Sequence, residues 1–484
     1  MAVFGAQVVV SLIFLSFLQK LCPIYSLGRW LLTRQGLVRY LHPTDDELKA
    51  LSGNGQRSAN GKKSRKTVNK GVQQNSTESF QVSRSVELHL SHAPLTPFDI
   101  LPLRFYSEFI WVMDFTLTTA FVVTLTYIHE HFLSPHTNEY GLSSLWCFLL
   151  MLFSLKPLIN IVSSYKISQN SGEVVLCCIF GFFFLISAMI ILIIDDKTLE
   201  FHLVSAHDSF TESANQFLSK RELSVIGDGS LVTFRMVLAF ISALVGALLT
   251  FPGVRVAKCH LDSLLIARDR PLLQMIMYAD LLFPVFILSL WVPPISRTPL
   301  LGKVIPGTAV EISDSLFDLF RDVTIVSFII VRMVLLRHRL QAYLNTACTK
   351  LEAIRKEAGK IYNTEIQGIV TQVFYYLCVV AVQLICPLTL IAATLLMNRS
   401  FTSANVAASP PAAAANVTDA DSESLVNSVR ANIQEFSLSL SELRSVFSSN
   451  LLQSVTSYFI WFFMYAWTVT TYFGIFYHTY LVRA

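Results

Sequence analysis

The sequence contains few charged residues for its length. Asp, Glu, Lys and Arg make up 14% of the 484 residues, against roughly 25% in an average soluble domain. Hydrophobic residues make up 53%, and many of them fall in long runs. This composition excludes an ordinary soluble domain and places the chain among polytopic membrane proteins. The net charge of +4 says little by itself, because in a membrane protein the placement of Lys and Arg matters more than their sum.

The sequence also lacks the motifs of common enzyme classes and ion sites. It contains no Gly-rich phosphate loop, no nucleophile elbow, no HExxH motif and no EF-hand loop. None of its eight cysteines falls in a predicted outside segment, and no pair has zinc-ligand spacing with nearby histidines. His129-Glu130-His131 offers three ligand side chains, but adjacent residues on a helix point in different directions. We therefore expect no disulfide framework, enzyme activity, catalytic residue, metal or cofactor.

Nine apolar segments are long enough to cross a hydrocarbon core of ~30 Å at ~1.5 Å per residue. We predict an all-α, polytopic helical membrane protein with nine spans and cytoplasmic amphipathic helices. The predicted spans cover residues 2–19, 108–132, 142–162, 174–194, 231–251, 273–292, 319–336, 370–397 and 453–477.

The first of these segments, residues 2–19, has two interpretations. A cleaved signal peptide would leave eight spans, but signal peptides carry positive charge before their apolar run. Here no basic residue precedes the run, whereas Lys20, Arg29, Arg34 and Arg39 follow it. That polarity favours an uncleaved span with its N-terminus outside.

The distribution of Lys and Arg over the loops supports this orientation. With the N-terminus outside, the inside segments carry 25 of these residues and the outside loops carry eight. Because cytoplasmic loops of membrane proteins carry an excess of Lys and Arg, we predict nine spans with the C-terminus inside. The inside segments are 20–107, 163–173, 252–272, 337–369 and the C-terminal tail, and the outside loops are 134–141, 195–230, 293–318 and 398–452.

Two loops have the composition of poorly structured segments. Residues 52–85 are polar, basic and rich in Gly, Ser and Asn, with too few apolar residues for a core. Residues 400–424 are rich in Ala, Ser and Pro and are predicted to be a flexible outside loop. Sequons in the outside loop predict N-glycosylation at Asn398 and Asn416.

These boundaries divide the chain into seven predicted regions. They are a first span or signal-like segment (1–19), a basic, partly disordered cytoplasmic region (20–107), a bundle of six spans (108–336), a cytoplasmic amphipathic helix (337–369), a span (370–397), an extracytoplasmic loop with sequons (398–452), and the last span with its tail (453–484).

Four charged side chains fall inside predicted spans at similar depth. Asp114, Lys156, Asp280 and Arg332 lie roughly 6–11 Å inside the cytoplasmic boundary, at ~1.5 Å per residue. A lone charge at a helix centre costs ~2.5–3.5 kcal/mol on insertion scales. We therefore expect ion pairs such as Asp114 with Lys156 and Asp280 with Arg332. Two interpretations stay open: the pairs fix helix packing, or the residues line the path of a channel or transporter.

Gln383 is a polar residue in the middle of a predicted span. It lies four residues before Pro387, which weakens the local helix ladder. A Gln at this depth is either an interhelical hydrogen-bonding group or a polar ligand in a pore, and the sequence alone leaves both open.

Residues 337–361 form a basic amphipathic pattern. Apolar residues recur at spacings of three and four, which places them on one stripe of a helix. The stripe could dock on the lipid surface or on the inner face of the bundle. It consists of Leu340, Leu344, Ala347, Leu351, Ile354, Ala358 and Ile361. The basic residues on the rest of the helix surface, a predicted membrane or partner face, are Arg339, Lys350, Arg355, Lys356 and Lys360.

A second amphipathic segment is predicted after the fifth span. Pro252-Gly253 should end that span at the cytoplasmic surface. Residues 254–267 then read as a helix in the membrane plane, with Arg255 and Lys258 available to anionic lipid.

Several short motifs resemble those of the transmembrane protein 161 family. They occur in family order from one end of the chain to the other, whereas residues 52–85 and 400–450 do not match. The motifs are Tyr25-Ser-Leu-Gly-Arg-Trp-Leu-Leu32, His42-Pro-Thr-Asp-Asp-Glu-Leu48, Leu249-Thr-Phe-Pro-Gly-Val-Arg255, His260-Leu-Asp262, Leu340-Gln-Ala-Tyr-Leu344, Lys356-Glu-Ala-Gly359, Val373-Phe-Tyr-Tyr-Leu-Cys378 and Phe473-Gly-Ile-Phe-Tyr-His478.

The resemblance implies a multi-pass membrane protein without established enzymatic activity. It also implies modulation of potassium and calcium currents, hence of membrane excitability and cardiac rhythm, and resistance to oxidative stress. The family has no agreed catalytic or ligand-binding motif, so no residue role is transferred. The expected partners are membrane lipid and ion channels or pumps, not nucleic acid, in the plasma membrane or the endoplasmic reticulum. The alternative hypothesis is a transporter or channel that uses the inner-leaflet charged residues.

Overall fold

The structure is a computed structural model of the whole chain. It describes residues 26–33, 36–51, 80–83, 90–132, 142–167, 171–220, 230–300, 313–357, 359–407 and 449–481, with the single residues 13, 16, 17 and 20. Most of the predicted first span, most of residues 52–85, and the sequon at Asn416 lie outside the described residues.

The described part of the chain contains seven helices that are long and apolar enough to cross a membrane. Each contains most of one predicted span, which confirms the all-α, polytopic fold. A further predicted span, residues 319–336, lies in α12 (Asp314–Lys356), a longer and more highly charged helix. The seven are α5 (Tyr106–Phe132), α6 (Leu142–Ile167), α7 (Ser171–Ile193), α9 (Ser230–Ile266), α10 (Pro271–Ser289), α14 (Leu377–Ala407) and α16 (Ser449–Phe476).

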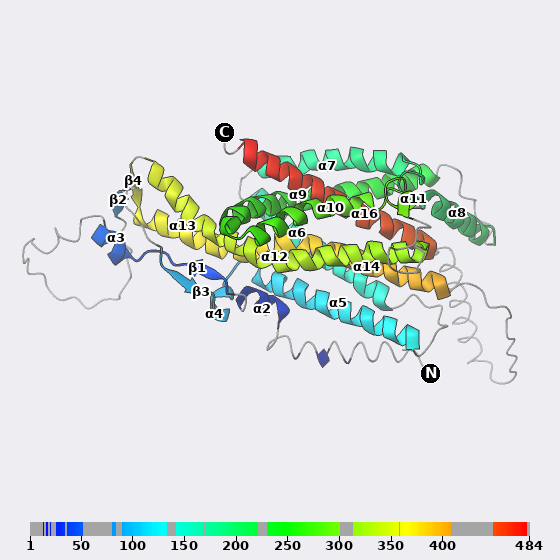
Figure 1. Cartoon of the computed structure of the whole chain (residues 1–484), viewed down its shortest axis with the longest axis horizontal. Helices are drawn as coiled ribbons and strands as arrows, with labels where there is room; N and C mark the ends of the chain where they lie inside the picture. The colour runs from blue at the N-terminus through cyan, green and yellow to red at the C-terminus, as the bar shows by residue number, and fades with distance from the viewer. Residues whose placement is uncertain are drawn as a thin grey trace, which may run out of the picture.

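These helices form one elongated bundle with α14 near its centre (Figure 1). Nearly all of α14 is buried inside the protein, whereas α7 and α10 present most of their residues outward. Phe, Leu and Val side chains from α9, α14 and α16 make up much of a single continuous core. The outward residues of α7 and α10 are mainly large and apolar, as expected of helices that face lipid.

The predicted break at Pro252-Gly253 is wrong, because α9 continues through both residues to Ile266. Pro252 removes one helical hydrogen bond, but the helix is held by packing on both sides of it. Leu249 and Thr250 before the proline and Val256, Ala257 and His260 after it are all buried. The segment after the proline is therefore part of a bundle helix and not a separate helix in the membrane plane.

Helix α12 is also continuous where the sequence predicts a boundary. Its 43 residues give a length of about 65 Å at 1.5 Å per residue. It runs along the bundle and projects beyond it (Figure 1). Strand β4 (Lys360–Tyr362) and helix α13 (Asn363–Tyr375) then separate it from α14. The amphipathic pattern is thus the projecting end of a helix that packs along the bundle, and it does not lead directly into the next span.

Short elements from the first hundred residues of the chain lie beside the start of α5 and along the projecting end of α12. Two-stranded antiparallel sheets form between β1 and β3 and between β2 and β4. We call these elements, with β4, α13 and the projecting end of α12, the extramembrane layer. The short elements are α2 (Leu27–Thr33), β1 (Val38–Tyr40), α3 (Asp45–Leu51), β2 (Gln81–Ser83), β3 (His92–Pro94) and α4 (Pro97–Ile100).

The apolar stripe of α12 docks on the protein and not on lipid. Leu340 and Leu344 belong to the bundle core. Leu351 and Ile361 join a smaller core with Leu48, to which Val82 and Ile366 also belong. The extramembrane layer is therefore packed against the bundle through one shared helix.

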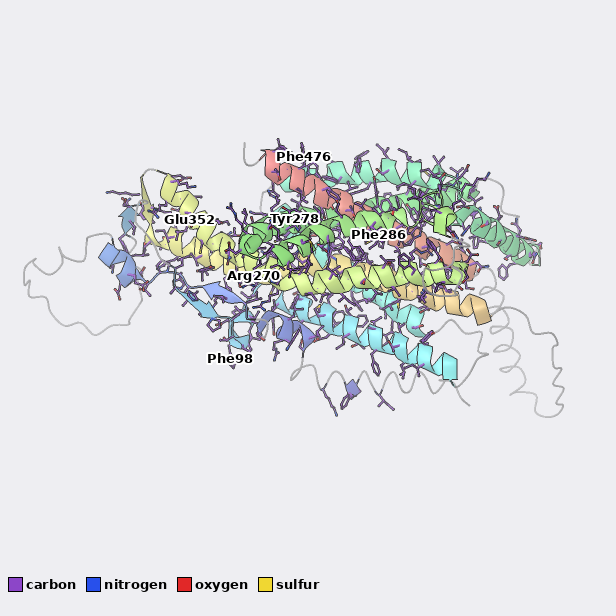
Figure 2. All side chains as sticks on the ribbon, in the orientation of Figure 1. Phe98, Arg270, Tyr278, Phe286, Glu352 and Phe476 are labelled. Carbon is purple, nitrogen blue, oxygen red and sulfur yellow. The ribbon has the colours of Figure 1, made fainter. Side chains whose placement is uncertain are left out.

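The two ends of the bundle differ in the segments they carry. The extramembrane layer lies at the end where α5 begins and α16 finishes, near Phe476 (Figures 1 and 2). Helices α8 (Leu203–Lys220) and α11 (Arg297–Leu300), from two predicted outside loops, lie at the other end. This arrangement agrees with the alternation predicted from Lys and Arg.

Candidate functional site

A cluster of three charged side chains lies inside the bundle between α10 and α12. Asp280 on α10 is 1% exposed, and Arg332 and Arg339 on α12 are 3% and 4% exposed. Arg332 Nε donates a hydrogen bond to Asp280 Oδ1 at 3.0 Å, and Arg339 Nη2 donates to Asp280 Oδ2. The two arginines are seven residues apart, which places them on one face of the helix two turns apart.

The two arginines donate hydrogen bonds to both oxygens of the Asp280 carboxylate. The guanidinium carbon of Arg332 also lies 4.7 Å from the ring centroid of Phe328 and 4.3 Å from that of Trp467 on α16. These rings provide cation–π contacts, which strengthen when water is excluded. The cluster therefore ties α10, α12 and α16 together at one depth.

The position of Arg339 differs from the sequence prediction. The predicted pair of Asp280 with Arg332 is present, but Arg339 was assigned to the membrane or partner face and is instead buried in the cluster. The spacing of seven residues from Arg332 is the sequence signal that could have identified it.

The space beside Arg332 is small. A cavity of about 10 Å³ is lined by Arg332, Trp467 and Tyr472, with Leu281, Pro284, Thr468 and Thr471. This is about the volume that one water molecule needs. The arrangement fits a packed ion pair better than a hydrated path for an ion at this point.

Asp114 and Lys156 are not brought together. Ser26 Oγ, just before α2, donates to Asp114 at 3.0 Å from Oδ1 and 3.2 Å from Oδ2. Lys156 is exposed on α6 and belongs to none of the ion pairs formed within the described part of the chain. The predicted Asp114–Lys156 pair is therefore wrong. A long Lys side chain on the outside of a bundle can reach the membrane interface, so it needs no partner inside.

Gln383 and Arg255 form a polar link between α14 and α9. Gln383 is 1% exposed, and its Oε1 accepts a hydrogen bond from Arg255 Nε at 3.3 Å. This contact favours the interhelical interpretation of Gln383. Arg255 was predicted to face lipid, but it is only partly exposed and reaches into the bundle. Its assignment to a lipid-facing surface is corrected.

Three of the remaining predicted basic residues, Arg355, Lys356 and Lys360, are exposed on the outer surface of the extramembrane layer. Lys350 is also exposed, but it lies beside the junction with the bundle, together with Lys258 on α9, which is only partly exposed. Glu352 marks this projecting end of α12, beyond Arg270 and the bundle (Figure 2). We call Arg355, Lys356 and Lys360 the basic face.

The sequon at Asn398 is inside α14 and not in an outside loop. Asn398 is 8% exposed, and its Oδ1 accepts a hydrogen bond from Thr456 Oγ1 of α16 at 3.0 Å. The helix extends ten residues past the predicted end of the span at residue 397. N-linked glycans are attached at surface positions, so the predicted modification of Asn398 does not fit this structure.

Replacing Asn398 by Gln should therefore leave the electrophoretic mobility of the protein from glycosylating cells unchanged. The companion variant Asn416→Gln tests the other sequon, whose glycosylation stays a prediction. A mobility shift that peptide N-glycosidase removes, and that Asn398→Gln alone abolishes, would contradict the buried placement.

Among the described residues, no group of three or more His, Cys, Asp or Glu side chains is placed to hold a metal ion. The described polar side chains inside the bundle mostly bond to one another or to helix carbonyls. Ser154 with Thr389 at 2.8 Å and Ser242 with Tyr458 at 3.0 Å are two further interhelical examples.

Comparison with known proteins extends over nearly the whole chain. A family model described as predicted transmembrane protein 161AB matches residues 2–482. The match includes the bundle, the extramembrane layer and the residues of the buried charge cluster. No solved structure matches the chain.

Proposed function

Because the chain belongs to the transmembrane protein 161 family, we propose that this multi-pass membrane protein is not an enzyme and modulates ion handling. The proposal concerns potassium and calcium currents, and through them membrane excitability and cardiac rhythm. It includes resistance to oxidative stress as a second property. The partner is a channel or pump in the plasma membrane or the endoplasmic reticulum, contacted through the basic face.

The continuity of α12 is the observation that carries this proposal. The same helix holds Arg332 and Arg339 in the buried charge cluster and presents the basic face at its far end. A contact made at the exposed end would therefore act on a helix fixed within the bundle. Because α12 has no break between the two regions, a push or tilt at one end displaces the other.

Within the extramembrane layer, the side-chain amides of Gln341 and Asn363 join the N-terminal strands to α12 and α13. Gln341 of α12 accepts from the backbone N of Val38 at 3.0 Å and donates to its carbonyl at 3.2 Å. Asn363 at the start of α13 also makes two hydrogen bonds with the backbone of Phe80: its side-chain Oδ1 accepts from the Phe80 N at 3.2 Å, and its backbone N donates to the Phe80 carbonyl at 3.1 Å. These paired bonds extend the strands β1 and β2, so the two strands are held on α12 and α13 by directional contacts.

The charge of the basic face suggests the chemistry of its partner. Arg355, Lys356 and Lys360 are all exposed at the projecting end. Positive surfaces of this kind accelerate association with acidic segments of a partner protein. We infer that the channel or pump offers an acidic cytoplasmic segment.

A transporter or channel in its own right is the second hypothesis, and it receives less support. Asp280 is engaged by two arginines, Gln383 by Arg255, and the cavity beside Arg332 has room for about one water molecule. Each of these polar groups serves a contact between helices. Their arrangement favours packing over conduction.

Charge reversal of the basic face tests the proposal. The variant Arg355→Glu, Lys356→Glu, Lys360→Glu should reduce the effect of the protein on whole-cell potassium and calcium currents to the level of cells without the protein. The physical reason is that reversal replaces attraction to an acidic partner by repulsion. Whole-cell recordings, with surface labelling to quantify the protein in the membrane, provide the measurement.

The matched control reverses Arg268 and Arg270, which are also exposed but lie on the turn between α9 and α10. This control should retain the effect of the wild-type protein on the currents. If the basic-face variant reached the membrane and changed currents as the wild type does, the proposal would be wrong.

A further inference from the structure

A pocket of about 380 Å³ opens where the bundle meets the extramembrane layer. Its walls come from α6, α9, α12, α13 and α14 and from the turn that precedes α5. The volume lies within the range of small-ligand pockets, about 300–1,000 Å³. Its charged lining residues are Arg104, Arg255, Lys258, Asp262 and Lys350.

The charge of this pocket is strongly positive. Four cations and one carboxylate give its lining a net charge of +3 at neutral pH. Lys258 and Lys350 belong to none of the ion pairs formed among the described residues. Partial burial lowers the pKa of Lys350, and the nearby charges of Lys258 and Arg255 lower it further. The cations are thus close enough to repel one another, which an anion in the pocket would relieve.

Hydrogen-bond donors accompany these cations. Tyr343 and Thr346 of α12 and Tyr376 at the end of α13 line the same pocket. Arg104 Nη1 donates to the Tyr376 hydroxyl at 3.5 Å, and its guanidinium carbon lies 5.9 Å from the centroid of that ring. The guanidinium is therefore positioned against an aromatic side chain at the pocket wall, a geometry suited to binding phosphate oxygens.

The location of the pocket indicates the source of its ligand. Ile161 of α6 and Val379 and Val380 of α14 form apolar lining, and both helices are long and apolar enough to cross the membrane. The pocket therefore combines a positive surface with the ends of membrane helices, where lipid headgroups lie. Basic pockets between membrane helices bind phosphorylated lipid headgroups in this way.

We propose that this pocket binds a phosphorylated anion, the headgroup of a phosphoinositide-type phospholipid. A phosphodiester alone carries one negative charge, whereas each phosphate monoester adds about −1.5 to −2. A net charge of +3 is matched by a headgroup with additional monoester phosphates and not by a zwitterionic or singly charged lipid. This site is separate from the basic face and does not depend on the proposed function.

Binding to the purified full-length chain in detergent tests the proposal. The probes are phosphatidylinositol bisphosphate, phosphatidylserine, phosphatidylcholine and water-soluble inositol trisphosphate, each titrated and followed by native mass spectrometry. The bisphosphate lipid should bind most tightly. The variant Lys258→Gln, Lys350→Gln should weaken its binding roughly 30-fold, because two basic contacts to phosphate are removed. Lys258→Arg, Lys350→Arg should retain binding.

Measurements of thermal stability distinguish a ligand-binding role of Lys258 and Lys350 from a structural role. If the two lysines face each other across an anion site, their replacement by Gln leaves the lipid-free protein as stable as the wild type or more stable. The bisphosphate lipid should raise the melting temperature of the wild type but not of the Gln variant. Arg268→Gln, Arg270→Gln is the matched control and should bind as the wild type does.

Three outcomes would overturn the inference. Equal binding of the bisphosphate lipid by the wild type and the Lys258→Gln, Lys350→Gln variant would exclude this pocket as the site. Equal binding of phosphatidylcholine and the bisphosphate lipid would exclude recognition of the additional monoester phosphates. Tight binding of inositol trisphosphate without binding of the lipid would assign the pocket to a soluble phosphate ester and exclude the lipid source.

Discussion

Replacing Asp280 by Asn is expected to destabilise the protein by about 3–5 kcal/mol, because it leaves two buried arginines without a counter-ion. Asp280 is 1% exposed and accepts from both Arg332 and Arg339. An Asn side chain keeps the shape but supplies no negative charge. The measurement is the temperature at which the full-length chain in detergent loses its monodisperse peak in size-exclusion chromatography.

Two companion variants identify the cause of this loss. Glu108→Gln also removes a carboxylate from a spanning helix, but Glu108 lies in the first turn of α5, where it accepts an exposed hydrogen bond from the Ser107 hydroxyl, so its effect should be within about 0.5 kcal/mol. The triple variant Asp280→Leu, Arg332→Met, Arg339→Met removes the whole cluster. It should recover most of the stability, since a buried ion network can be replaced by apolar side chains at little net cost.

The Asp280→Asn variant also distinguishes a packing role of the charge cluster from a role in ion conduction. If purified wild-type protein carried ions across liposomes, and Asp280→Asn abolished this flux while the melting temperature stayed unchanged, the charge cluster would belong to a transport path. Loss of stability without any flux in either protein is the result that the packed geometry predicts.

Replacing Gly474 by Leu should prevent α9 and α16 from packing and lower stability by about 3 kcal/mol or more. A Cβ atom added at Gly474 would lie 2.7 Å from the Ala257 Cβ and 3.0 Å from the Val254 Cα. The second of these atoms is backbone, so relief requires a shift of α9 itself. On α9 a Cβ added at Gly253 would meet Thr470 of α16 in the same way. The expected result is a lower melting temperature and less folded protein from membranes.

The chain offers a matched glycine control in α13. A Cβ added at Gly368 would meet no other atom within 4 Å, so Gly368→Ala should stabilise the protein by about 0.5–1 kcal/mol through helix propensity. The milder change Gly474→Ala should be partly rescued by Ala257→Gly, which removes the nearest atom. A Gly474→Leu protein that melts with the wild type would show that α9 and α16 are not this close.

The close contact at Gly253 also explains why the predicted helix end was wrong. Pro-Gly is a strong local signal for the end of a helix, yet α9 continues through it. Here the proline is buried and the glycine lets α16 approach. The residues that weaken the helix locally are the ones that a neighbouring helix packs against, and this packing outweighs the local preference.

The buried charges were only partly predictable for a related reason. The free-energy cost of a lone charge inside a span predicted a partner for Asp280, and Arg332, at matching depth, is one of its partners in the structure. Arg339 lay beyond the predicted span boundary and was assigned to the membrane or partner face, because the sequence does not show that α12 continues as part of the bundle. The Asp114–Lys156 pair failed because equal depth does not place two side chains on facing surfaces.

The sequence by itself determined the class of this protein and the alternation of its segments. Both follow from local quantities, namely the apolar length of each segment and the charge of the loops beside it. Only the tertiary structure decided which polar groups meet, where the stripe of α12 docks, and that four cations from three parts of the chain line one pocket. The physical reason is that these contacts depend on which faces of the helices meet. The packing of the whole bundle determines which face each helix turns toward its neighbours.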